Sequence, residues 1–374
     1  MKVCHVISGY YRNDPRVFQR QCKSLHSAGM DLCILTNDGL PNEILDEIEI
    51  FSTEKIWNNR LKVLLFAYFQ FINEAISIDA DVYQLHSPEL ITLGLALKRK
   101  GKLVVYDAHE DLPRHILEKD WLPKVVRRPI SNFIEAFMHW SLSRYDGIVS
   151  PHHHVVDNLS HINNNTVLIT NFAKVVPSID VSRSSFLKRE RIICYSGTVY
   201  LHSNQFSVLD SIAAIANVRY QIAGFMDESM LHKMSQHRAF GKVDYLGRIQ
   251  WEELKDFYHK AIIGLVIIDY KMNLGSKRGT FAVNKLFEYM EAGLPVICSD
   301  YDLWREIIEK YECGICVEPG NISELKSAID YLLNNKDRAY EMGQRGRKAV
   351  YEEYNWKTQE GPYVEMFKDL YYGK

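Results

Sequence analysis

A lysine and a glutamate lie three residues apart near the start of one expected helix, in the segment GTFAVNKLFEYMEAGLPVICSD at 279–300. Lys285 and Glu288 share one face of a helix predicted over 282–292, because residues three apart on a helix are neighbours. A cation is disfavoured in the first turn of a helix, where unpaired amide groups are already positive. A bound diphosphate would explain Lys285 there, and Glu288 could accept hydrogen bonds from both hydroxyls of a ribose. The alternative is a surface ion pair, which would stabilise the helix by only about 0.2–0.5 kcal/mol.

Three glycines follow predicted strands in the same half of the chain, in YSGTVY at 195–200, QIAGF at 221–225 and VDYLGRI at 243–249. A glycine at a strand end lets a phosphate approach the backbone closely, and the next helix start can add its dipole. Gly197, Gly224 and Gly247 together indicate a phosphate site more strongly than any one of them. Arg248 then lies at the carboxyl end of its strand, and the alternative for it is a solvated arginine in a turn.

Two further patterns contain residues that bind metals, but both have simpler interpretations. The spacing of Cys313 and Cys316 fits a redox or zinc pair, yet no second pair accompanies it. The odd number of cysteines, seven, and their placement in apolar runs favour free thiols in a reducing compartment. The adjacent side chains of His152, His153 and His154 point in different directions, so we expect them to begin a helix rather than to share an ion.

Two Asp-x-Asp pairs, Asp79 with Asp81 and Asp300 with Asp302, are the remaining metal candidates. The first pair precedes a predicted strand and would lie at its amino end, away from the expected ligand site. The second pair follows a strand, but a helix N-cap is its simpler role. We therefore expect no metal ion and no other cofactor.

Short apolar runs alternate with amphipathic helical stretches along the whole chain, which predicts an α/β fold with mostly parallel sheets. Strands are predicted over 2–7, 31–36, 48–52, 82–86, 102–106, 147–150 and 166–170, and again over 191–196, 218–223, 243–246, 262–268, 295–298 and 313–317. Helices are predicted over 15–29, 58–78, 89–100, 121–143, 151–161, 204–216, 227–238, 251–260, 282–292, 302–310 and, with a break, 321–354. The polar segment 172–190 divides two doubly wound domains, and ligands are expected at the carboxyl ends of the strands, in the cleft between domains.

Composition excludes several classes of protein. The chain has 374 residues, enough for two domains, and its 47% hydrophobic and 25% charged residues are ordinary for a soluble globular protein. A net charge of −2 gives no electrostatic footprint for nucleic acid. The longest apolar run, VLLFAYFQFI at 63–72, is about half as long as a membrane-spanning helix, and MKVCHVIS at the start is too soon polar for a secretory signal. A cytoplasmic location is expected.

The segment NKLFEYMEAGLPVI resembles the signature of family 4 glycosyltransferases, in the group with a lysine three residues before the glutamate. YSGT, LGRI and CGICVEPGN resemble other landmarks of the family's C-terminal half. HVISGYYRNDPRVFQRQCKSLHSAGMDLCILT and DVYQLHSPELITLGLALKRKGKLVVYDAHEDLP are similar to landmarks of its N-terminal half, so the resemblance covers essentially the whole chain in order.

The resemblance implies the GT-B fold, in which two Rossmann-like domains face each other across a cleft. Residues 1–171 would form the acceptor-binding domain, to which a final helix near 356–374 would cross back. Residues 172–190 would be the linker, and 191–355 would bind a nucleotide-sugar donor.

The resemblance also assigns residues of the first domain. It implies that His109 in YDAHEDLP is catalytic and contacts the donor sugar; the alternative is an ordinary loop histidine. Asp107 and Glu110 flank His109 and could orient it or touch the acceptor. His86 and Glu89 follow the preceding strand and would face the same cleft.

The loop GYYRNDPR after the first strand is the implied acceptor loop. Gly9 would let the acceptor approach the backbone, while Asp14 or Arg16 could bind acceptor hydroxyls. An ion pair between Asp14 and Arg16 is the alternative.

Two departures from the family pattern affect the donor site. Thr280 stands where the family usually has a glutamate, eight residues before Glu288. The basic residues usual after YSGT are also missing, so Lys285 and Arg248 are expected to supply the charge on the leaving phosphate, with Lys277 and Arg278 as alternatives. The implied donor-binding residues are Gly197, Thr198, Gly224, Arg248, Thr280, Asn284 and Leu286, and Lys285 and Glu288 are implied as catalytic.

The resemblance implies a metal-independent enzyme of the hexosyltransferase type. Such an enzyme would move a sugar from a nucleotide-sugar, with UDP favoured and GDP next, to a saccharide or lipid-linked saccharide, with retention of configuration. The expected pathway is synthesis of a bacterial surface polysaccharide such as an O-antigen or capsule. Two alternatives are a nucleotide-sugar epimerase on the same fold and a catalytically weak scaffold or partner subunit, which Thr280 suggests.

The predicted helix 121–143 mixes Trp, Phe and basic residues in WLPKVVRRPISNFIEAFMHW. Lys124, Arg127 and Arg128 could meet a membrane surface that holds a lipid-linked acceptor, which would place the chain peripherally on the inner face of the cell membrane. Pro129 is expected to interrupt the helix and keep the amphipathic run short. Ordinary packing with a solvated basic end is the alternative.

Overall fold

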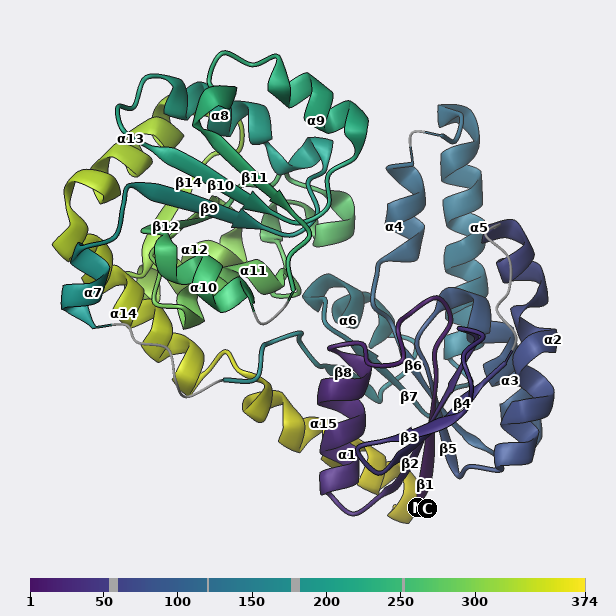
Figure 1. Cartoon of the computed structure of the whole chain (residues 1–374). Coiled ribbons are helices and arrows are strands. Elements are labelled where there is room, and N and C mark those ends of the chain that lie inside the picture. The colour runs from purple at the N-terminus through teal and green to yellow at the C-terminus, as the bar shows by residue number, and fades with distance from the viewer. Residues whose placement is uncertain (54–59, 120, 176–181, 251–252, 374) are drawn as a thin grey trace. The chain divides into compact units, whose positions relative to one another are not determined.

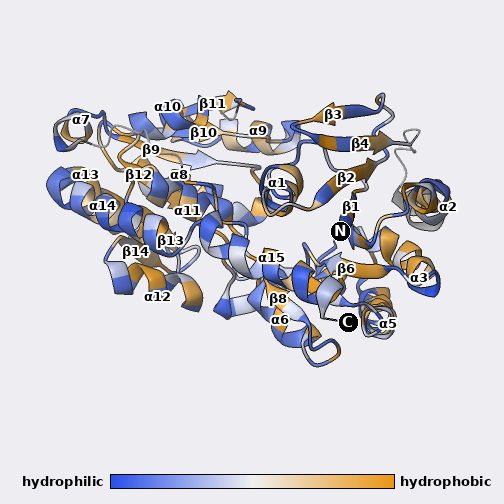
Figure 2. Cartoon of the chain, turned by 90° about the horizontal axis from the view of Figure 1, so that it is seen from below, coloured by the Kyte–Doolittle hydropathy of each residue, from blue (hydrophilic) through white to orange (hydrophobic). Residues whose placement is uncertain are grey.

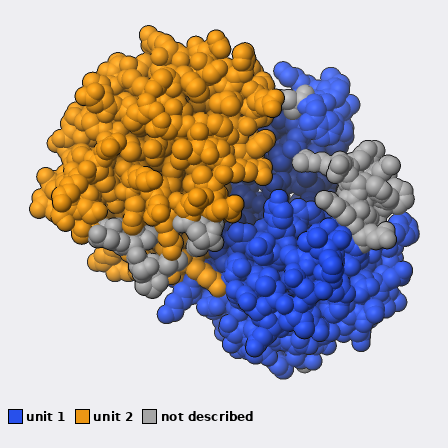
Figure 3. Space-filling model, in the orientation of Figure 1, with its two compact units in different colours: residues 1–171, 272–274, 356–374 blue, residues 172–271, 275–355 orange. Residues whose placement is uncertain are grey.

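The computed structural model describes residues 1–53, 60–119, 121–175, 182–250 and 253–373, although not the side chains of 60–66. The chain forms two compact units (Figures 1 and 3). Unit 1 comprises residues 1–171, 272–274 and 356–374, and unit 2 comprises 172–271 and 275–355.

Unit 1 contains a sheet of eight strands in the order β3-β4-β2-β1-β5-β6-β7-β8. Its strands are β1 Lys2–Val6, β2 Asp31–Thr36, β3 Glu43–Leu45, β4 Ile48–Ser52, β5 Val82–Leu85, β6 Leu103–Asp107, β7 Gly147–Ser150 and β8 Thr166–Leu168. All neighbours are parallel except β3 and β4. The central strands β1, β5 and β6 are buried along almost their whole length, as expected of a parallel sheet covered on both faces.

Helices cover both faces of this sheet. They are α1 Lys23–Ser27, α2 Arg60–Ile78, α3 Ile91–Arg99, α4 Leu112–Leu117, α5 Lys124–Leu142, α6 His153–Leu159 and α15 Trp356–Tyr372, with a π-helical segment Val17–Cys22 before α1 and a 3-10 turn Pro88–Leu90 before α3. Alternate residues of β1 enter two separate cores: Cys4 and Val6 pack with α2, α3 and α5, whereas Val3 packs with α1 and α15.

The last helix, α15, packs beside α1 in unit 1 (Figure 1). Trp356 is buried and donates a hydrogen bond from Nε1 to the Ser24 hydroxyl at 2.8 Å. Tyr363 is completely buried and donates to the side-chain oxygen of Gln84. Residues at the two ends of the chain thus share one core.

Unit 2 contains a fully parallel sheet of six strands in the order β11-β10-β9-β12-β13-β14. The strands are β9 Ile192–Ser196, β10 Arg219–Ala223, β11 Val243–Gly247, β12 Ile263–Val266, β13 Val296–Ser299 and β14 Gly314–Val317. The helices are α7 Arg183–Leu187, α8 Gln205–Ala213, α9 Glu228–Ser235, α10 Glu253–Lys260, α11 Asn284–Glu291, α12 Asp302–Tyr311, α13 Ile322–Asn334 and α14 Lys336–Glu352, with 3-10 turns at Leu201–Ser203, Phe240–Lys242 and Ser276–Arg278. Most of these helices carry both hydrophilic and hydrophobic residues (Figure 2).

The predicted α/β fold with two doubly wound sheets is confirmed. The sequence did not reveal β3, α4 or α7. Helix α7 lies inside the segment predicted as linker: Ser182 caps it by accepting a hydrogen bond from the Ser185 amide, and Phe186 is buried. Parts of three predicted segments lie outside the described residues, namely 58–59 and 251–252 of helices and 176–181 of the linker.

The expected break at Pro129 is wrong, because α5 runs through that residue. Pro129 is the sixth residue of the helix and is exposed. A proline at this position removes one backbone hydrogen bond, the one that would end on the Val125 carbonyl, and the helix continues without it.

Candidate active site

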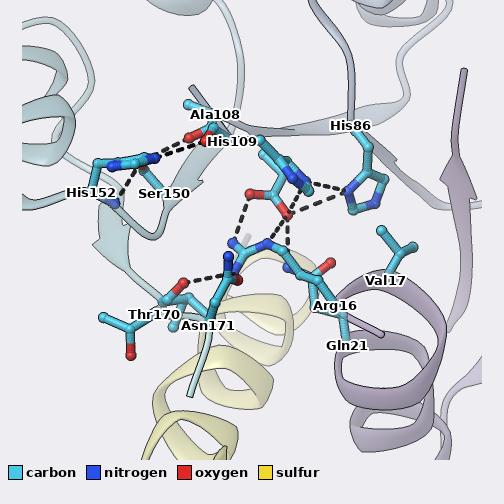
Figure 4. Close-up of polar contacts among 12 residues, drawn as sticks. Arg16, Val17, Gln21, His86, Ala108, His109, Ser150, His152, Thr170 and Asn171 are labelled. Carbon is cyan, nitrogen blue, oxygen red and sulfur yellow. Dashed lines mark hydrogen bonds and ion pairs between the residues drawn. The ribbon is translucent and has the colours of Figure 1, made fainter. Parts of the chain in front are cut away.

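Three neighbouring parallel strands in the centre of the unit 1 sheet carry polar residues at or near their carboxyl ends. His5 lies within β1, His86 directly follows β5, and Asp107 is the last residue of β6. Because β1, β5 and β6 are adjacent and parallel, their carboxyl ends meet. Arg16, from the segment that follows β1, reaches the same place (Figure 4).

Asp107 is the centre of this group and is completely buried. Its Oδ1 accepts a hydrogen bond from Arg16 at 2.8 Å, and its Oδ2 accepts one from Arg16 Nε at 3.0 Å and one from Gln21 at 2.7 Å. Arg16 is only 4% exposed and also donates to the Ile169 carbonyl and the Asn171 side chain. Burial alone would raise the pKa of Asp107, but the Arg16 charge and neighbouring histidines hold that pKa well below its usual value. Asp107 is therefore an ionised carboxylate in a fixed orientation.

Two buried histidines extend from this carboxylate. His86 Nδ1 lies 3.3 Å from Asp107 Oδ2, and His86 Nε2 lies 2.9 Å from His5 Nδ1. Burial lowers the pKa of both histidines, so both are neutral at pH 7. Because a carboxylate only accepts hydrogen bonds, His86 carries its proton on Nδ1 and accepts at Nε2 from His5. The Nε2 of His5 is then unprotonated, and within the described residues it has no hydrogen-bond partner.

His109 is held by contacts of its ring and of its carbonyl. Its Nε2 lies 3.1 Å from Asp107 Oδ2, its ring centre lies 5.3 Å from that of Tyr10, and its carbonyl accepts a hydrogen bond from His152 Nε2 at 2.8 Å. The side chain of His109 is 15% exposed. With Nε2 donating to Asp107, Nδ1 is left available for a ligand.

The three strand-end glycines of unit 2 lie side by side. The Gly224 amide donates to the Gly247 carbonyl at 2.7 Å, and the Gly197 amide donates to the Ala223 carbonyl at 2.8 Å. A Cβ at Gly224, whose φ is +141°, would lie 2.0 Å from the Gly197 carbonyl oxygen, so no other residue fits. Because these three residues have no side chains, the backbone at the carboxyl ends of β9, β10 and β11 is not covered by side chains of its own.

Lys285 is the second residue of α11 and points toward the first of these glycines. Its Nζ lies 3.8 Å from the centre of the Tyr195 ring and 3.3 Å from the place that a Cβ on Gly197 would occupy. No ion pair joins Lys285 to Glu288, both of which are described, so the surface pair that their spacing allowed is not formed. The side-chain oxygen of Asn284 is buried and, within the described residues, has no hydrogen-bond partner. An ammonium, a helix start and a glycine backbone together are suited to bind an anion.

Glu288 is half-buried and fixed through one oxygen. Its Oε2 accepts a hydrogen bond from the Tyr258 hydroxyl at 2.9 Å, and that hydroxyl also lies 2.9 Å from Ser196 Oγ. The Tyr289 hydroxyl accepts the Ser196 amide at 2.7 Å. These contacts orient Glu288 and leave its Oε1 for a ligand.

The other predicted donor residues differ in exposure. Arg248 is exposed and lies 5.0 Å from the Phe225 ring. Thr280 and Leu286 are completely buried, so their side chains cannot touch a ligand in this arrangement. Thr280 Oγ1 accepts the Ala282 amide at 3.1 Å.

Two family models match the chain, one for each half. Residues 15–173 match "Glycosyltransferase Family 4", and residues 179–349 match "Glycosyl transferases group 1". The chain is a family 4 glycosyltransferase. No protein with a curated description matches its sequence.

Solved structures agree with the GT-B fold of this glycosyltransferase. Sucrose-phosphate synthase from Thermosynechococcus elongatus is similar over 100% of both chains, with a TM-score of 0.77 and 16% identity. Anabaena HepE in complex with UDP-glucose covers 99% of this chain and 100% of its own, with a TM-score of 0.71 and 12% identity. S. aureus MnaA with UDP covers 98% of this chain and 96% of its own, with a TM-score of 0.60 and 10% identity.

The loop after β1, which was predicted to bind the acceptor, is arranged differently from expectation at two positions. The Arg16 guanidinium is buried against Asp107. It is therefore not accessible to an acceptor, and it does not form the alternative ion pair with Asp14. Asp14 Oδ1 instead accepts the amides of Arg16 and Val17, at 2.8 and 2.9 Å. Gly9 is exposed with open space around it. Glu110 accepts a hydrogen bond from His115 at 2.8 Å, which lowers its pKa.

The second Asp-x-Asp pair does not form the expected N-cap. Tyr301 precedes the first turn of α12, and Asp300 binds Arg305 and Lys277, the latter at 2.9 Å. Lys277 is therefore already paired and is a weaker candidate for phosphate than Lys285. Cys313 and Cys316 form no disulfide, since all seven cysteines are free. Cys316 Sγ lies 3.8 Å from Cys298 Sγ on the neighbouring strand.

One cluster in the glycosyltransferase has the residue types of a metal site. His86, Asp107 and His109 each offer an atom, and these atoms lie within 4.8 Å of one another. However, Asp107 Oδ2 already accepts from Arg16 and Gln21. A divalent cation would also meet the Arg16 charge in a buried place, so the histidines fit better as hydrogen-bond donors to Asp107.

Sequence reasoning missed the residues that fix the candidate catalytic groups. Tyr258 on α10 holds Glu288, Gln21 supports Asp107, and Tyr195 lies under Lys285. Tyr195 and Gln21 lie inside motifs described above, but no role was assigned to them there, and Tyr258 lies outside every such motif. Only Tyr195, two residues before Gly197, had a position that could have drawn attention.

Among the helices described here, none has an apolar stretch sufficient to span a bilayer.

The buried histidines make the stability of unit 1 sensitive to acid. Burial, together with His154, lowers the pKa of His152 to about 4. Above pH ~6.5 the His152 side chain is neutral in both the folded and the unfolded state. Between about pH 6.5 and pH 4, His152 takes up a proton in the unfolded state only. We expect the free energy of unfolding to fall by about 1.4 kcal/mol per pH unit for this group alone in that window, and burial of His5 and His86 acts in the same direction.

Urea unfolding at pH 7.5, 6.5, 5.5 and 5.0 measures this effect. His152→Gln should reduce the slope by about one proton, while His161→Gln, at an exposed histidine, should leave it unchanged. A wild-type stability that does not change from pH 7 to 5 would contradict the assignment of neutral buried histidines.

Proposed function

We propose that this glycosyltransferase binds a UDP-sugar at the start of α11 and transfers the sugar, with retention, to a saccharide or lipid-linked saccharide. The position of the Lys285 ammonium most supports this proposal: it lies beside the Gly197 backbone and over the Tyr195 ring. A diphosphate would supply the negative charge that this ammonium and the helix start attract. Glu288 Oε1 would then accept hydrogen bonds from the ribose hydroxyls.

Uridine is proposed as the base because the similar structures of Anabaena HepE and S. aureus MnaA contain UDP-glucose and UDP. Building of a bacterial surface polysaccharide is proposed from the sequence resemblance.

The proposed reaction breaks the bond between the sugar C1 and the diphosphate oxygen. The acceptor oxygen bonds to C1 on the same face, and its proton passes to the leaving phosphate oxygen. Lys285 and Arg248 stabilise the negative charge that develops there. His109 contacts the donor sugar through Nδ1, and Asp107 keeps the ring in that orientation.

The role of His109 is tested by measuring UDP release from a panel of UDP-sugars, without divalent metal. The wild-type chain should hydrolyse one of them slowly, and His109→Ala should lower that rate by about 10²–10³-fold, the usual effect of removing one such polar contact in the transition state. His161→Ala, at an exposed histidine, should retain the wild-type rate. Equal rates for wild type and His109→Ala would remove His109 from the mechanism.

A further inference from the structure

Helix α5 presents a row of apolar side chains to its outside. Val125 is 82% exposed, Phe133 74% and Trp140 48%, and Pro129 and Ala136 between them are also exposed. Their spacing of three or four residues places all five on one stripe of the helix. We call Val125, Pro129, Phe133, Ala136 and Trp140 the α5 outer face.

The inner side of α5 includes small polar residues. Ser131 and Ser141 are 5% and 0% exposed. Ser131 donates to the Pro113 carbonyl at 2.8 Å, whereas Ser141 Oγ is buried and has no hydrogen-bond partner in the described part of the chain. A helix that serves only its own fold would place serine outside and phenylalanine inside. The reversed positions of Ser141 and Phe133 indicate that the outer face is made to contact something else.

Basic residues lie at both ends of this apolar stripe. Lys124 and Arg128 are exposed beside Val125, and Arg144 lies 4.2 Å from the Trp140 ring. Arg127 also belongs to the same end of α5, and Glu135 is the only acidic residue of the helix. The surface that fits this face is therefore apolar with negative charge at its rim.

Two tryptophans lie near the ends of the stripe. Trp121, which is 72% exposed, precedes α5, and Trp140 lies in its last turn. Tryptophan rings and basic side chains around an apolar stripe are typical of helices that lie in the headgroup region of a bilayer. A second copy of the chain fits less well, because each copy would bring Lys124, Arg128 and Arg144 with Glu135 alone to balance them.

We propose that the α5 outer face docks on an anionic lipid bilayer, with Phe133 and Trp140 among the acyl chains and Lys124 and Arg128 at the headgroups. This goes beyond the proposed transfer reaction and does not depend on it. Docking would hold the glycosyltransferase at the surface where a lipid-linked acceptor is found.

Sedimentation with vesicles tests the proposal. Full-length chain is mixed with vesicles of phosphatidylcholine alone or with about one third phosphatidylglycerol, at low and high salt. Binding is expected with the anionic vesicles, and it should weaken as salt screens the basic residues. The double variant Phe133→Ser/Trp140→Ser and the double variant Lys124→Glu/Arg128→Glu should each lose binding by about ten-fold or more.

Ile44→Ser is the matched control, because Ile44 is an apolar residue on β3 that is 71% exposed. It should bind vesicles as the wild type does, and circular dichroism should show all variants folded. Absence of vesicle binding by the folded wild type, or equal loss in Ile44→Ser, would overturn the proposal. So would a dimer in solution that the Phe133→Ser/Trp140→Ser variant abolishes, since the face would then join two copies. UDP binding is measured separately, so failure here is distinguishable from failure of the proposed transfer.

Discussion

Replacement of Arg16 by alanine is expected to lower the free energy of unfolding of unit 1 by about 3–5 kcal/mol, the usual cost of leaving a buried charge without its partner. Asp107 is completely buried, and Arg16 contacts both of its oxygens. In a unit of this size the loss corresponds to a fall in Tm of roughly 6–20 °C. Thermal and urea unfolding of the purified variant measure it.

Two further variants separate the charge effect from a general loss of packing. Arg183→Ala breaks an arginine–aspartate pair with Asp337 whose side chains are 63% and 61% exposed, and should cost less than about 1 kcal/mol. Arg16→Met combined with Asp107→Asn removes both buried charges and should recover much of the stability lost in Arg16→Ala. If Arg16→Ala lost no more stability than Arg183→Ala, the buried pair would not be the support that we describe.

Replacement of Lys285 by alanine is expected to lower kcat/KM for the donor by about 10²–10³-fold, because it removes a preorganised cation from the leaving phosphate. The fold should survive, since the described contact of Nζ is with the Tyr195 ring, and such a contact contributes only about 0.5–1 kcal/mol at an accessible site. Initial rates of UDP release at several donor concentrations give the value.

Lys233→Ala provides the control, because Lys233 is an exposed lysine on α9 of the same unit. It should leave kcat/KM unchanged. A Lys285→Ala enzyme that retained more than about a tenth of the wild-type kcat/KM would show that another cation, such as Arg248, neutralises the phosphate.

The order of strands and helices could be predicted because parallel strands are buried on both faces and appear as apolar runs between amphipathic stretches. The strand-end glycines could be predicted because each directly follows an apolar run in the sequence. These features depend on local patterns that a single chain displays.

The partners of the candidate catalytic groups could not be predicted in the same way. Arg16 and Asp107 are 91 residues apart, and Tyr258 and Glu288 are 30 apart. Nothing in the neighbourhood of Arg16 indicates that its guanidinium turns inward to a strand end, and Asp14 was the nearer candidate. Such pairings arise only when the sheet brings separate strand ends together.

Calorimetric titration with UDP, without divalent metal, tests the central claim most directly: that the start of α11 holds a nucleotide. We predict that UDP binds more tightly than GDP, ADP or CMP, and that Glu288→Ala weakens UDP binding by about 10–100-fold, the effect of losing hydrogen bonds to a charged group. Glu306→Ala, at an exposed glutamate on α12, should bind UDP as the wild type does. If no nucleotide binds, or if UDP binds Glu288→Ala as tightly as the wild type, the donor site is not where Lys285 and Glu288 lie.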